Sequence, residues 1–531
     1  TEEMIERARR TANLAGVPRT TWTTAEEFFR RLDRVRGDLP VYQGELYLEY
    51  HRGTYTTQGE YKRRHRALER ALQAHEAVRV ALGRGPVDEK DWQRLLFGEF
   101  HDALPGSSIG IVYRQLGGEL EARGKTVLDR ATAELSAGRR GAGWNVFNPV
   151  AIPRRAVVDI PGRWEPVLVA LAGLEGKSVA DAERGGPGTI REATAQVLDN
   201  GALRAEFGAH GHLVGMWVDG EPLAIEGAGF STYHDDPHGC DAWDIDHGVL
   251  RHPRFEANRV DLKLVERNAF RATLEGSTPL GKKSRMTVRY ILDAACPHLK
   301  IEVAVDWHES HRLLKYNVQT GYRGRRAVFG TPFGSIDRPQ QPGTEREEAM
   351  WEVPGSRWAA VLRDDGTGLA VVTEAKYGFS CRDGNLGLSL LRSPKGPDGT
   401  ADMGVHRIRF ALGRFEPRTG EGVLSTAACA EALYAPVLVT RGAAVKPPFA
   451  IEEPGSLVAS WVLPCAESKG FVIRLHETAG SPGTAVLRLA RPRQVDLVDF
   501  LERPIGRVRH RPDGSFALEY RPYQILSVRV R

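Results

Sequence analysis

The strongest constraint on the fold comes from the last roughly four hundred residues, where short strand-forming segments recur at intervals of about ten residues. Gly, Pro, Asp and Asn separate the segments, of which clear examples span 156–160, 286–292, 299–305 and 524–530. Antiparallel strands need only short turns between them, so this spacing predicts large antiparallel β-sandwiches. We assign a large β-sandwich domain to 141–435 and a carboxyl-terminal β domain to 436–531.

The sequence from about residue 58 to 140 has helical periodicity instead. Apolar residues keep helical spacing from about 60 to 82, from about 88 to 100, and from a cap at Ser107 or Ser108 to about 135. The residues of the second helix that should face inward are Trp92, Leu95, Leu96 and Phe100. Three antiparallel helices with short connections predict a three-helix bundle at 58–140.

Residues 1–57 read as two helices, capped by Thr1 and Thr24, followed by an extended stretch at 39–48 that is rich in strand formers. This order indicates the end of an α/β domain. The predicted fold class is therefore multidomain α+β: the tail of an α/β domain, a three-helix bundle, then large antiparallel β-sandwich domains. Because the chain starts at Thr1 rather than Met, we expect it to be part of a longer protein.

Composition excludes several classes of protein. The hydrophobic share of 41% and the charged share of 27% are those of a globular chain. The basic run at 62–66 lacks interleaved aromatic residues, which favours a solvated helix face, so we expect no nucleic-acid partner. No apolar stretch approaches the ~18 residues of a membrane span. Five cysteines without a Cys-x-x-Cys pair fit reduced thiols in a cytoplasmic protein, and the oligomeric state, a homo-oligomer included, stays open.

The segment 99–108 places His101 beside Asp102 where a helix ends before Pro105 and Gly106. A side chain at a helix end can hold a metal ligand rigidly. Most such pairs are a surface histidine and a helix-terminal carboxylate, and zinc needs further ligands that the local spacing does not supply.

A second polar segment, 44–58, carries Glu45, Glu49, His51 and Arg52 at the exit of the predicted strand. Ligand sites of α/β folds lie at such strand ends. The alternative is a polar loop in which Glu45 and Glu49 are solvated.

A third segment groups acids around Trp243, namely Asp241, Asp244 and Asp246. Clustered acids and an indole ring are suited to gripping a sugar by hydrogen bonds and stacking. A β-turn with solvated acids accounts for the same pattern.

Taken in order, these segments resemble the bacterial and cytosolic α-mannosidases of glycoside hydrolase family 38. The matching segments are 44–49, 51–58, 100–108, 241–246 and 390–394, with shorter likenesses at 474–477 and 521–523. The likeness runs nearly from end to end of the chain.

The resemblance implies a zinc-dependent retaining α-mannosidase that removes terminal α-D-mannosyl residues from mannose-containing oligosaccharides by double displacement. It implies that His101 is a zinc ligand, that Asp102 hydrogen-bonds sugar hydroxyls, and that residues 1–57 are the end of the catalytic domain. Glu49 is the candidate general acid/base, and His51 and Arg52 are candidate substrate-binding residues. The nucleophile and the other zinc ligands are expected upstream of Thr1, so this chain alone is expected to be inactive.

A competing hypothesis is a non-catalytic carbohydrate-binding or assembly module built from the sandwiches alone. A His-x-Asp motif and a further strand-end Asp encoded upstream of Thr1 would favour the mannosidase over the module.

Overall fold

The computed structural model describes residues 1–137, 143–183, 188–256, 259–442, 444–467 and 469–531. The chain divides into two compact units, Thr1–Leu48 and Glu49–Arg531. The domain boundary predicted at 140/141 lies outside the described residues, and the other predicted domain limits stay predictions.

The first unit holds two short helices, α1 (Glu2–Thr11) and α2 (Ala25–Asp33), and a 3-10 turn, η1 (Arg36–Asp38). Both predicted caps are confirmed, since the Thr1 and Thr24 hydroxyls accept hydrogen bonds from the third amide of each helix. The strand predicted at 39–48 is wrong, because the described residues there form no ladder. An extended segment becomes a strand only where a partner satisfies its amides and carbonyls, and local composition cannot supply that partner.

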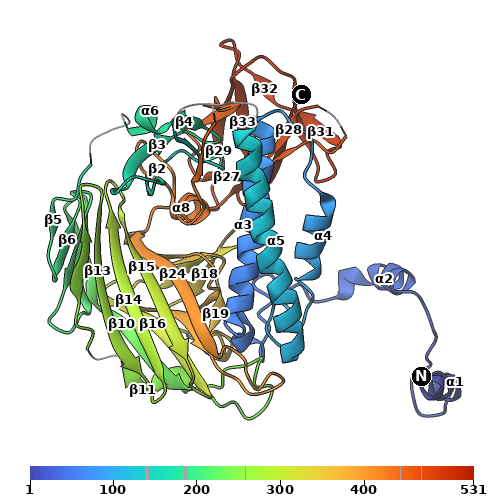
Figure 1. Ribbon diagram of the computed structural model, residues 1–531. Coiled ribbons are helices and arrows are strands. Elements are labelled where there is room, and N and C mark those ends of the chain that lie inside the picture. The colour runs from blue at the N-terminus through green and yellow to red at the C-terminus, as the bar shows by residue number, and fades with distance from the viewer. Residues whose placement is uncertain (138–142, 184–187, 257–258, 443, 468) are drawn as a thin grey trace. The chain divides into compact units, whose positions relative to one another are not determined.

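Three helices open the second unit: α3 (Gly59–Ala81), α4 (Glu89–Phe97) and α5 (Gly110–Ser136). Helices α3 and α5 lie side by side along most of their length (Figure 1). All three contribute to one apolar cluster, with Leu68 and Leu72 from α3, Leu95 from α4 and Leu120 from α5. Burial of these side chains holds the helices together.

Two details of the helical region differ from the prediction. Leu96 and Phe100 are 56% and 59% exposed. Leu95 already takes the core-facing position of the last turn of α4, and Phe100 lies beyond the end of that helix. The predicted cap of α5 is also wrong, because Ile109 occupies the N-cap position and the Ser107 hydroxyl donates to Asp102 Oδ1 over 3.1 Å instead.

The large sandwich consists of two antiparallel sheets over the described residues. The nine-stranded sheet runs, in order, β12 (Lys263–Arg267), β13 (Arg271–Leu280), β14 (Ser284–Asp293), β15 (His298–Trp307), β24 (Gly404–Arg414), β21 (Gly368–Thr373), β20 (Trp358–Leu362), β17 (Arg326–Thr331) and β18 (Gly334–Pro339). The eleven-stranded sheet runs β19 (Val353–Pro354), β22 (Gly378–Arg382), β23 (Asn385–Arg392), β16 (Arg312–Thr320), β10 (Ile225–His234), β8 (Leu213–Val218), β7 (Leu203–Phe207), β6 (Val197–Asp199) and β5 (Glu192–Ala193), with β11 (Pro253–Glu256) on β10 and β9 (Glu221–Leu223) on β8.

Aromatic side chains show that the two sheets pack face to face. Tyr316 on β16 contacts Phe410 on β24 with ring centroids 4.9 Å apart, and Phe207 on β7 lies 4.6 Å from Tyr290 on β14. The strands predicted at 286–292 and 299–305 are confirmed as parts of β14 and β15. The strand-rich fold with several antiparallel sheets is the one that the sequence predicted.

Two small sheets take strands from 145–178, between the helices and the large sandwich in sequence, and from 438–440, between the two sandwiches. One runs β25 (Leu438–Thr440), β1 (Asn145–Phe147) and β4 (Gly176–Ser178), and the other pairs β2 (Arg154–Val158) with β3 (Val167–Leu171). The remaining short helices are α6 (Val179–Glu183), α7 (Glu345–Glu348), α8 (Thr426–Ala432), and the 3-10 turns η2 (Arg52–Tyr55) and η3 (Val249–Arg251).

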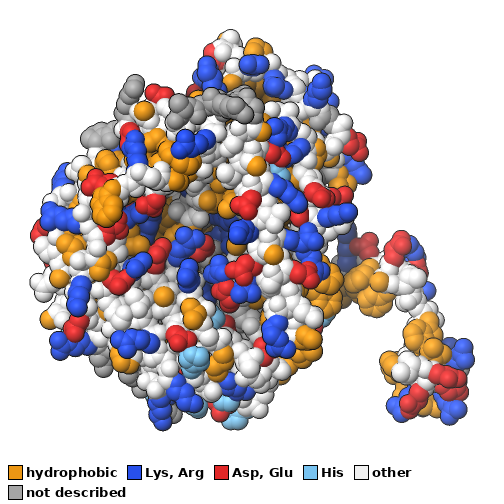
Figure 2. All heavy atoms as spheres, viewed as in Figure 1, with side chains coloured by type: hydrophobic (Ala, Val, Ile, Leu, Met, Phe, Trp, Pro, Cys, Tyr) orange, Lys and Arg blue, Asp and Glu red, His pale blue; other side chains and the backbone are white. Residues whose placement is uncertain are grey.

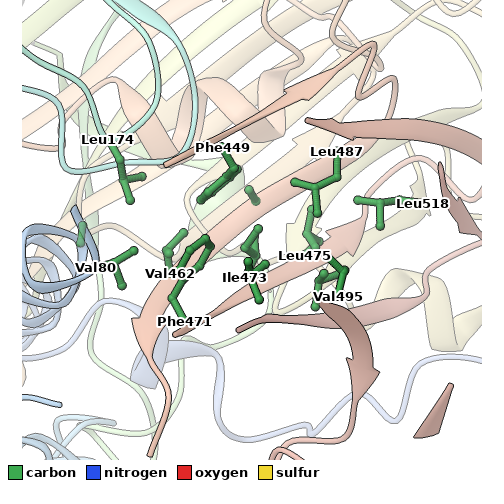
Figure 3. Packing of buried hydrophobic residues seen from close by; sticks show 14 of the residues in the cluster. Val80, Leu174, Phe449, Val462, Phe471, Ile473, Leu475, Leu487, Val495 and Leu518 are labelled. Carbon is green, nitrogen blue, oxygen red and sulfur yellow. The ribbon is translucent and has the colours of Figure 1, made fainter. Parts of the chain in front are cut away.

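The carboxyl-terminal sandwich packs a four-stranded sheet against a five-stranded sheet, counted over the described residues. The first is β26 (Phe449–Glu452), β29 (Gly483–Leu489), β33 (Phe516–Tyr520) and β32 (Arg509–His510); the second is β27 (Leu457–Pro464), β28 (Phe471–Glu477), β34 (Ile525–Val530), β30 (Val495–Val498) and β31 (Pro504–Arg507). Phe449 and Phe471 stack across the interface at 5.7 Å (Figure 3). Val80 of α3 joins this core, so the helices and the sandwich share buried surface.

Within the described ranges, no helix is long and apolar enough to cross a membrane. The five cysteines, all of them among the described residues, form no disulfide bond.

A buried histidine in the large sandwich is expected to make stability depend on pH. His298 begins β15, lies opposite Gly413 of β24, and places Nε2 3.4 Å from Cys429 Sγ. Burial lowers the pKa of His298 from 6.5 to about 4. A lowered pKa means that the folded state binds fewer protons than the unfolded state, so stability is lost as pH falls from about 6.5 to 4, by about 3 kcal/mol.

We therefore expect the Tm of His298→Gln to fall less steeply than that of the unmodified chain between about pH 6.5 and pH 4. Calorimetry at several pH values measures this. His308→Gln is the control, because His308 follows the same strand but is exposed. Parallel Tm curves for His298→Gln and the unmodified chain would contradict the expectation.

Candidate functional site

The polar segment 51–58 is folded as the 3-10 turn η2 and leads directly into α3. Gly53 N donates to Trp243 O over 2.7 Å, and Thr57 Oγ1 donates to Ala242 O over 2.9 Å. The structure therefore brings the segment beside 241–246, from which it is separated by nearly two hundred residues of sequence.

Arg52 is buried inside this junction, with 2% of its surface exposed. Its Nη1 lies 3.1 Å from Asp244 Oδ1, its Nε and Nη2 donate to Ala349 O, and its guanidinium lies 3.7 Å from the centre of the Trp351 ring. These contacts hold η2 against the large sandwich. The Arg52 side chain lies in the interior of this unit. The substrate-binding role predicted for it stays a prediction.

Arg392, which ends β23, completes the junction. Its Nε donates to Asp235 Oδ2 over 2.7 Å, its Nη1 donates to Thr57 Oγ1 and Ala242 O at 3.1 Å each, and its Nη2 donates to Asp244 O over 2.8 Å. Both members of the Arg392–Asp235 ion pair are fully buried. Three of the sequence segments singled out above, 51–58, 241–246 and 390–394, thus meet at one side chain.

Two glycines allow this close approach. A Cβ on Gly53 would lie 2.0 Å from Arg392 Nη1. Gly106 has φ of +98°, and a Cβ there would lie 2.5 Å from Thr57 O. Only glycine leaves both spaces open.

Lys62 joins the segment 100–108 to the junction. Its Nζ donates to Thr57 O over 2.6 Å and to Leu104 O over 2.7 Å. Burial lowers the pKa of Lys62 to about 7. The basic run at 62–66, predicted to be a solvated helix face, is in part buried, because Lys62, His65 and Arg66 are 4%, 6% and 6% exposed.

The N-terminus of α3 is fixed by Asp402, from the connection between β23 and β24. Its Oδ2 and Oδ1 accept hydrogen bonds from Gln58 N and Gly59 N over 2.8 and 2.7 Å. A carboxylate at this position satisfies free amides and complements the helix dipole.

His101 and Asp102 lie in the turn after α4, and their side chains are 78% and 41% exposed. His101 Nε2 is 3.3 Å from Asp102 Oδ2. The backbone of Asp102 is held by Tyr113, whose hydroxyl donates to Asp102 O over 2.9 Å. The turn is therefore anchored while the imidazole and the carboxylate remain accessible.

Exposed apolar side chains surround this turn in sequence: Leu96, Phe97, Phe100, Ile109 and Ile111. Phe100 lies against the His101 ring, with centroids 4.3 Å apart. Glu49 is exposed, and its carbonyl lies 3.1 Å from Nδ1 of the half-buried His51. The predicted roles of Glu49 and His51 stay predictions.

An imidazole nitrogen is a ligand that zinc accepts, so the exposed His101 fits a position in a zinc site. Across the part of the chain that the structure describes, no group of three or more His, Cys, Asp or Glu side chains is arranged to hold a metal. The described residues supply part of such a site at most.

Two of the acids of 241–246, Asp241 and Asp244, make their contacts inside the unit. Asp244 pairs with Arg52 and is 5% exposed, so it is neither solvated nor open to a sugar. Asp241 Oδ2 accepts from Lys395 N over 2.5 Å and from Gly396 N over 3.2 Å, and lies 3.3 Å from His311 Nε2. Sequence reasoning missed Asp235 and Arg392 as a pair; of the two, only Arg392 lies in a segment singled out above.

Comparison with known proteins decides the family. Three family models match in order: the alpha mannosidase middle domain at 49–135, the glycosyl hydrolases family 38 C-terminal domain at 198–400, and the glycosyl hydrolases family 38 C-terminal beta sandwich domain at 456–528. The chain belongs to glycosyl hydrolase family 38. The family 38 matches cover the Arg392 junction and the His101–Asp102 turn.

Curated relatives of this family 38 chain include Alpha-mannosidase 2C1 of Homo sapiens, 30% identical over 572 residues, covering 99% of this chain and 54% of the relative. Alpha-mannosidase G of Dictyostelium discoideum is 25% identical, covering 91% of this chain and 52% of the relative. The chain thus spans about half the length of these relatives.

Two solved structures share the fold of this family 38 chain. An alpha-mannosidase from Enterococcus faecalis V583 aligns with a TM-score of 0.74 at 14% identity, covering 95% of this chain and 72% of that one. A family 38 glycosyl hydrolase from Enterococcus faecalis also aligns with a TM-score of 0.74, at 13% identity, covering 100% of this chain and 79% of that one.

Proposed function

We propose that this chain serves in a zinc-dependent, retaining α-mannosidase that hydrolyses terminal α-D-mannosyl residues of oligosaccharides. The observation that supports this most is the ordered match of three family 38 domains, together with relatives named alpha-mannosidase over nearly the whole chain. The accessible His101–Asp102 turn, anchored by Tyr113 and Lys62, supplies a place for sugar recognition.

In this proposal His101 holds zinc through an imidazole nitrogen, and Asp102 accepts hydrogen bonds from hydroxyls of the mannose ring. Bound zinc would orient the sugar and stabilise developing charge, which is template and electrostatic chemistry. Retention requires a nucleophilic carboxylate and an acid/base about 5–5.5 Å apart. Glu49, which is exposed beside His51, is the candidate general acid/base. Location in the cytoplasm is part of the same proposal.

The test is hydrolysis of an aryl α-mannoside, with metal content, measured on this chain and on the full-length gene product. We expect the full-length product to be active with about one zinc per chain, and His101→Ala to lose about 100-fold or more of kcat/KM together with the metal. His308→Gln is the control, since His308 is an exposed histidine of the large sandwich.

An inactive, metal-free full-length product would overturn the proposal. If that product instead bound mannosides without cleaving them, the carbohydrate-binding module would be the better assignment.

A further inference from the structure

A cavity of about 680 Å³, walled mostly by apolar surface, lies against α3 on the side of the carboxyl-terminal sandwich. Its walls come from all three matched regions: Arg66 and Glu69 of α3, Arg357 before β20, Glu431 of α8, and His476 of β28. Aromatic side chains, among them Phe333 and Trp461, close other parts of the wall.

Arg66 presents an unused hydrogen-bonding edge in this wall. It is 6% exposed, and its Nη1 pairs with Glu69. Its Nε and Nη2 are buried and have no hydrogen-bond partner among the described residues. These two atoms form one edge of the guanidinium, with parallel N–H bonds that fit two oxygens of one phosphate, sulfate or carboxylate.

Two histidines add ring nitrogens without a hydrogen-bond partner to the same wall. His476 is 5% exposed, and its Nδ1 has no partner within the described part of the chain. His65 Nε2 is likewise without a hydrogen bond there, its nearest carboxylate oxygen being Glu99 Oε1 at 3.4 Å. Buried polar groups are rarely left unsatisfied, so four such nitrogens in one cavity point to an oxygen-rich occupant.

The charges around Arg66 do not balance. Arg66 pairs with Glu69, while Arg70 and Arg357 share the single carboxylate of Glu431. Three guanidinium groups therefore face two carboxylates, which leaves one positive charge in a buried setting. Burial and the neighbouring Arg66 charge lower the pKa of Arg70 to about 9. Bound water would satisfy the unpaired N–H groups but would leave the excess positive charge without a counter-ion.

Arg66, Glu431 and His476 all line this cavity. Glu431 is among the charged groups that most affect both Arg66 and His476, and Arg357 also acts on His476.

An adjoining cavity of about 920 Å³ also reaches Arg66. Its lining holds seven Lys and Arg residues against five Asp and Glu residues. On the face shown in Figure 2, Lys and Arg side chains gather around a hollow between the strands and the helices. Such a basic opening raises the local concentration of anions.

We infer that the cavity beside Arg66 binds a tetrahedral oxyanion, phosphate or sulfate, either free or carried on a sugar. Arg66 would hold two of its oxygens through Nε and Nη2, and His476 and His65 would donate to the others. The cavity wall includes Glu99, Leu104 and Pro105, which flank the His101–Asp102 turn, but none of the proposed anion-binding side chains belongs to that turn. The inference stands whether or not the protein cleaves mannosides.

The first test is the Tm of the chain in sodium phosphate, sodium sulfate and sodium chloride of equal ionic strength, with titration calorimetry against phosphate. We expect a Tm about 2 °C or more higher in about 50 mM phosphate or sulfate than in chloride. Mannose 6-phosphate, compared with mannose plus phosphate, separates the two sources: a larger shift with the ester assigns the group to a sugar.

Arg66→Lys keeps the charge and the partner Glu69 but removes the two-pronged edge, so phosphate affinity should fall about tenfold or more. The matched control is Arg488→Lys, which alters an exposed arginine paired with Glu452 and should keep the full phosphate effect. Equal stabilisation by phosphate and chloride, or full affinity in Arg66→Lys, would overturn the proposal.

A crystal of the unmodified chain soaked in selenate gives a result that does not depend on any variant folding. Anomalous scattering should place the anion within hydrogen-bond reach of the Arg66 edge and His476. Selenate bound only elsewhere, or bound nowhere, would count against the site.

Discussion

Replacing Arg392 with methionine is expected to lower the free energy of unfolding by about 3–5 kcal/mol. The substitution removes four hydrogen bonds at once and leaves Asp235 as a buried carboxylate without its cation. Burial already raises the pKa of Asp235 in the presence of Arg392. The lowered stability should appear in the Tm and as faster hydrogen exchange of the Gly53 amide, because the junction holds η2 in place.

The double variant Arg392→Met with Asp235→Asn should recover part of the loss, since it removes the stranded charge. Arg326→Met is the control: Arg326 pairs with Asp337 at the surface, where such pairs contribute about 0–1 kcal/mol. A loss at Arg392 no larger than at Arg326 would show that the junction does not hold the segments together.

Replacing Lys315 with methionine is also expected to lower the free energy of unfolding by about 3–5 kcal/mol, because it too breaks a buried ion pair. Lys315 on β16 places Nζ 2.6 Å from Glu352 Oε2 and 2.8 Å from Ser389 Oγ, and the ion pair is almost completely buried. Burial lowers the pKa of Lys315 and raises that of Glu352, so burial disfavours both charges, and each charge offsets part of that cost for the other.

Removing both charges should therefore be much less harmful than removing one. The double variant Lys315→Met with Glu352→Leu is expected to regain most of the stability lost in Lys315→Met, because a buried ion pair is often replaceable by apolar side chains of similar size. Thermal unfolding of the three proteins measures this. Additive losses would indicate that Glu352 and Lys315 act independently.

The strands of the sandwiches could be predicted from the sequence because the residue patterns that define a strand are local. Strands such as β14 and β15 alternate in burial along their length and end at turn residues, so neighbouring residues define them. The strand predicted at 39–48 failed for the complementary reason: pairing needs a partner, and none is specified nearby.

The candidate site was only partly predictable. His101 and Asp102 adjoin in sequence, so a local motif could identify them. Arg392 and Asp235 are 157 residues apart, and Arg70 and Glu431 are 361 apart, so no spacing rule joins them. Arg52 could be singled out from the sequence because it lies in a segment crowded with polar residues. Only the structure shows that its guanidinium contacts Asp244 and Trp351.

The small sheet β25–β1–β4 has a consequence for how the protein is made. Its central strand, Asn145–Phe147, pairs with Leu438–Thr440, so one of its edges stays open until about 290 further residues have left the ribosome. At about 5–20 residues per second that delay is about 15–60 seconds. Phe147 and the ends of α3 and α5 share a core with the carboxyl-terminal sandwich. A chaperone that shields nascent chains should therefore bind this region, and slowing translation should lengthen its exposure.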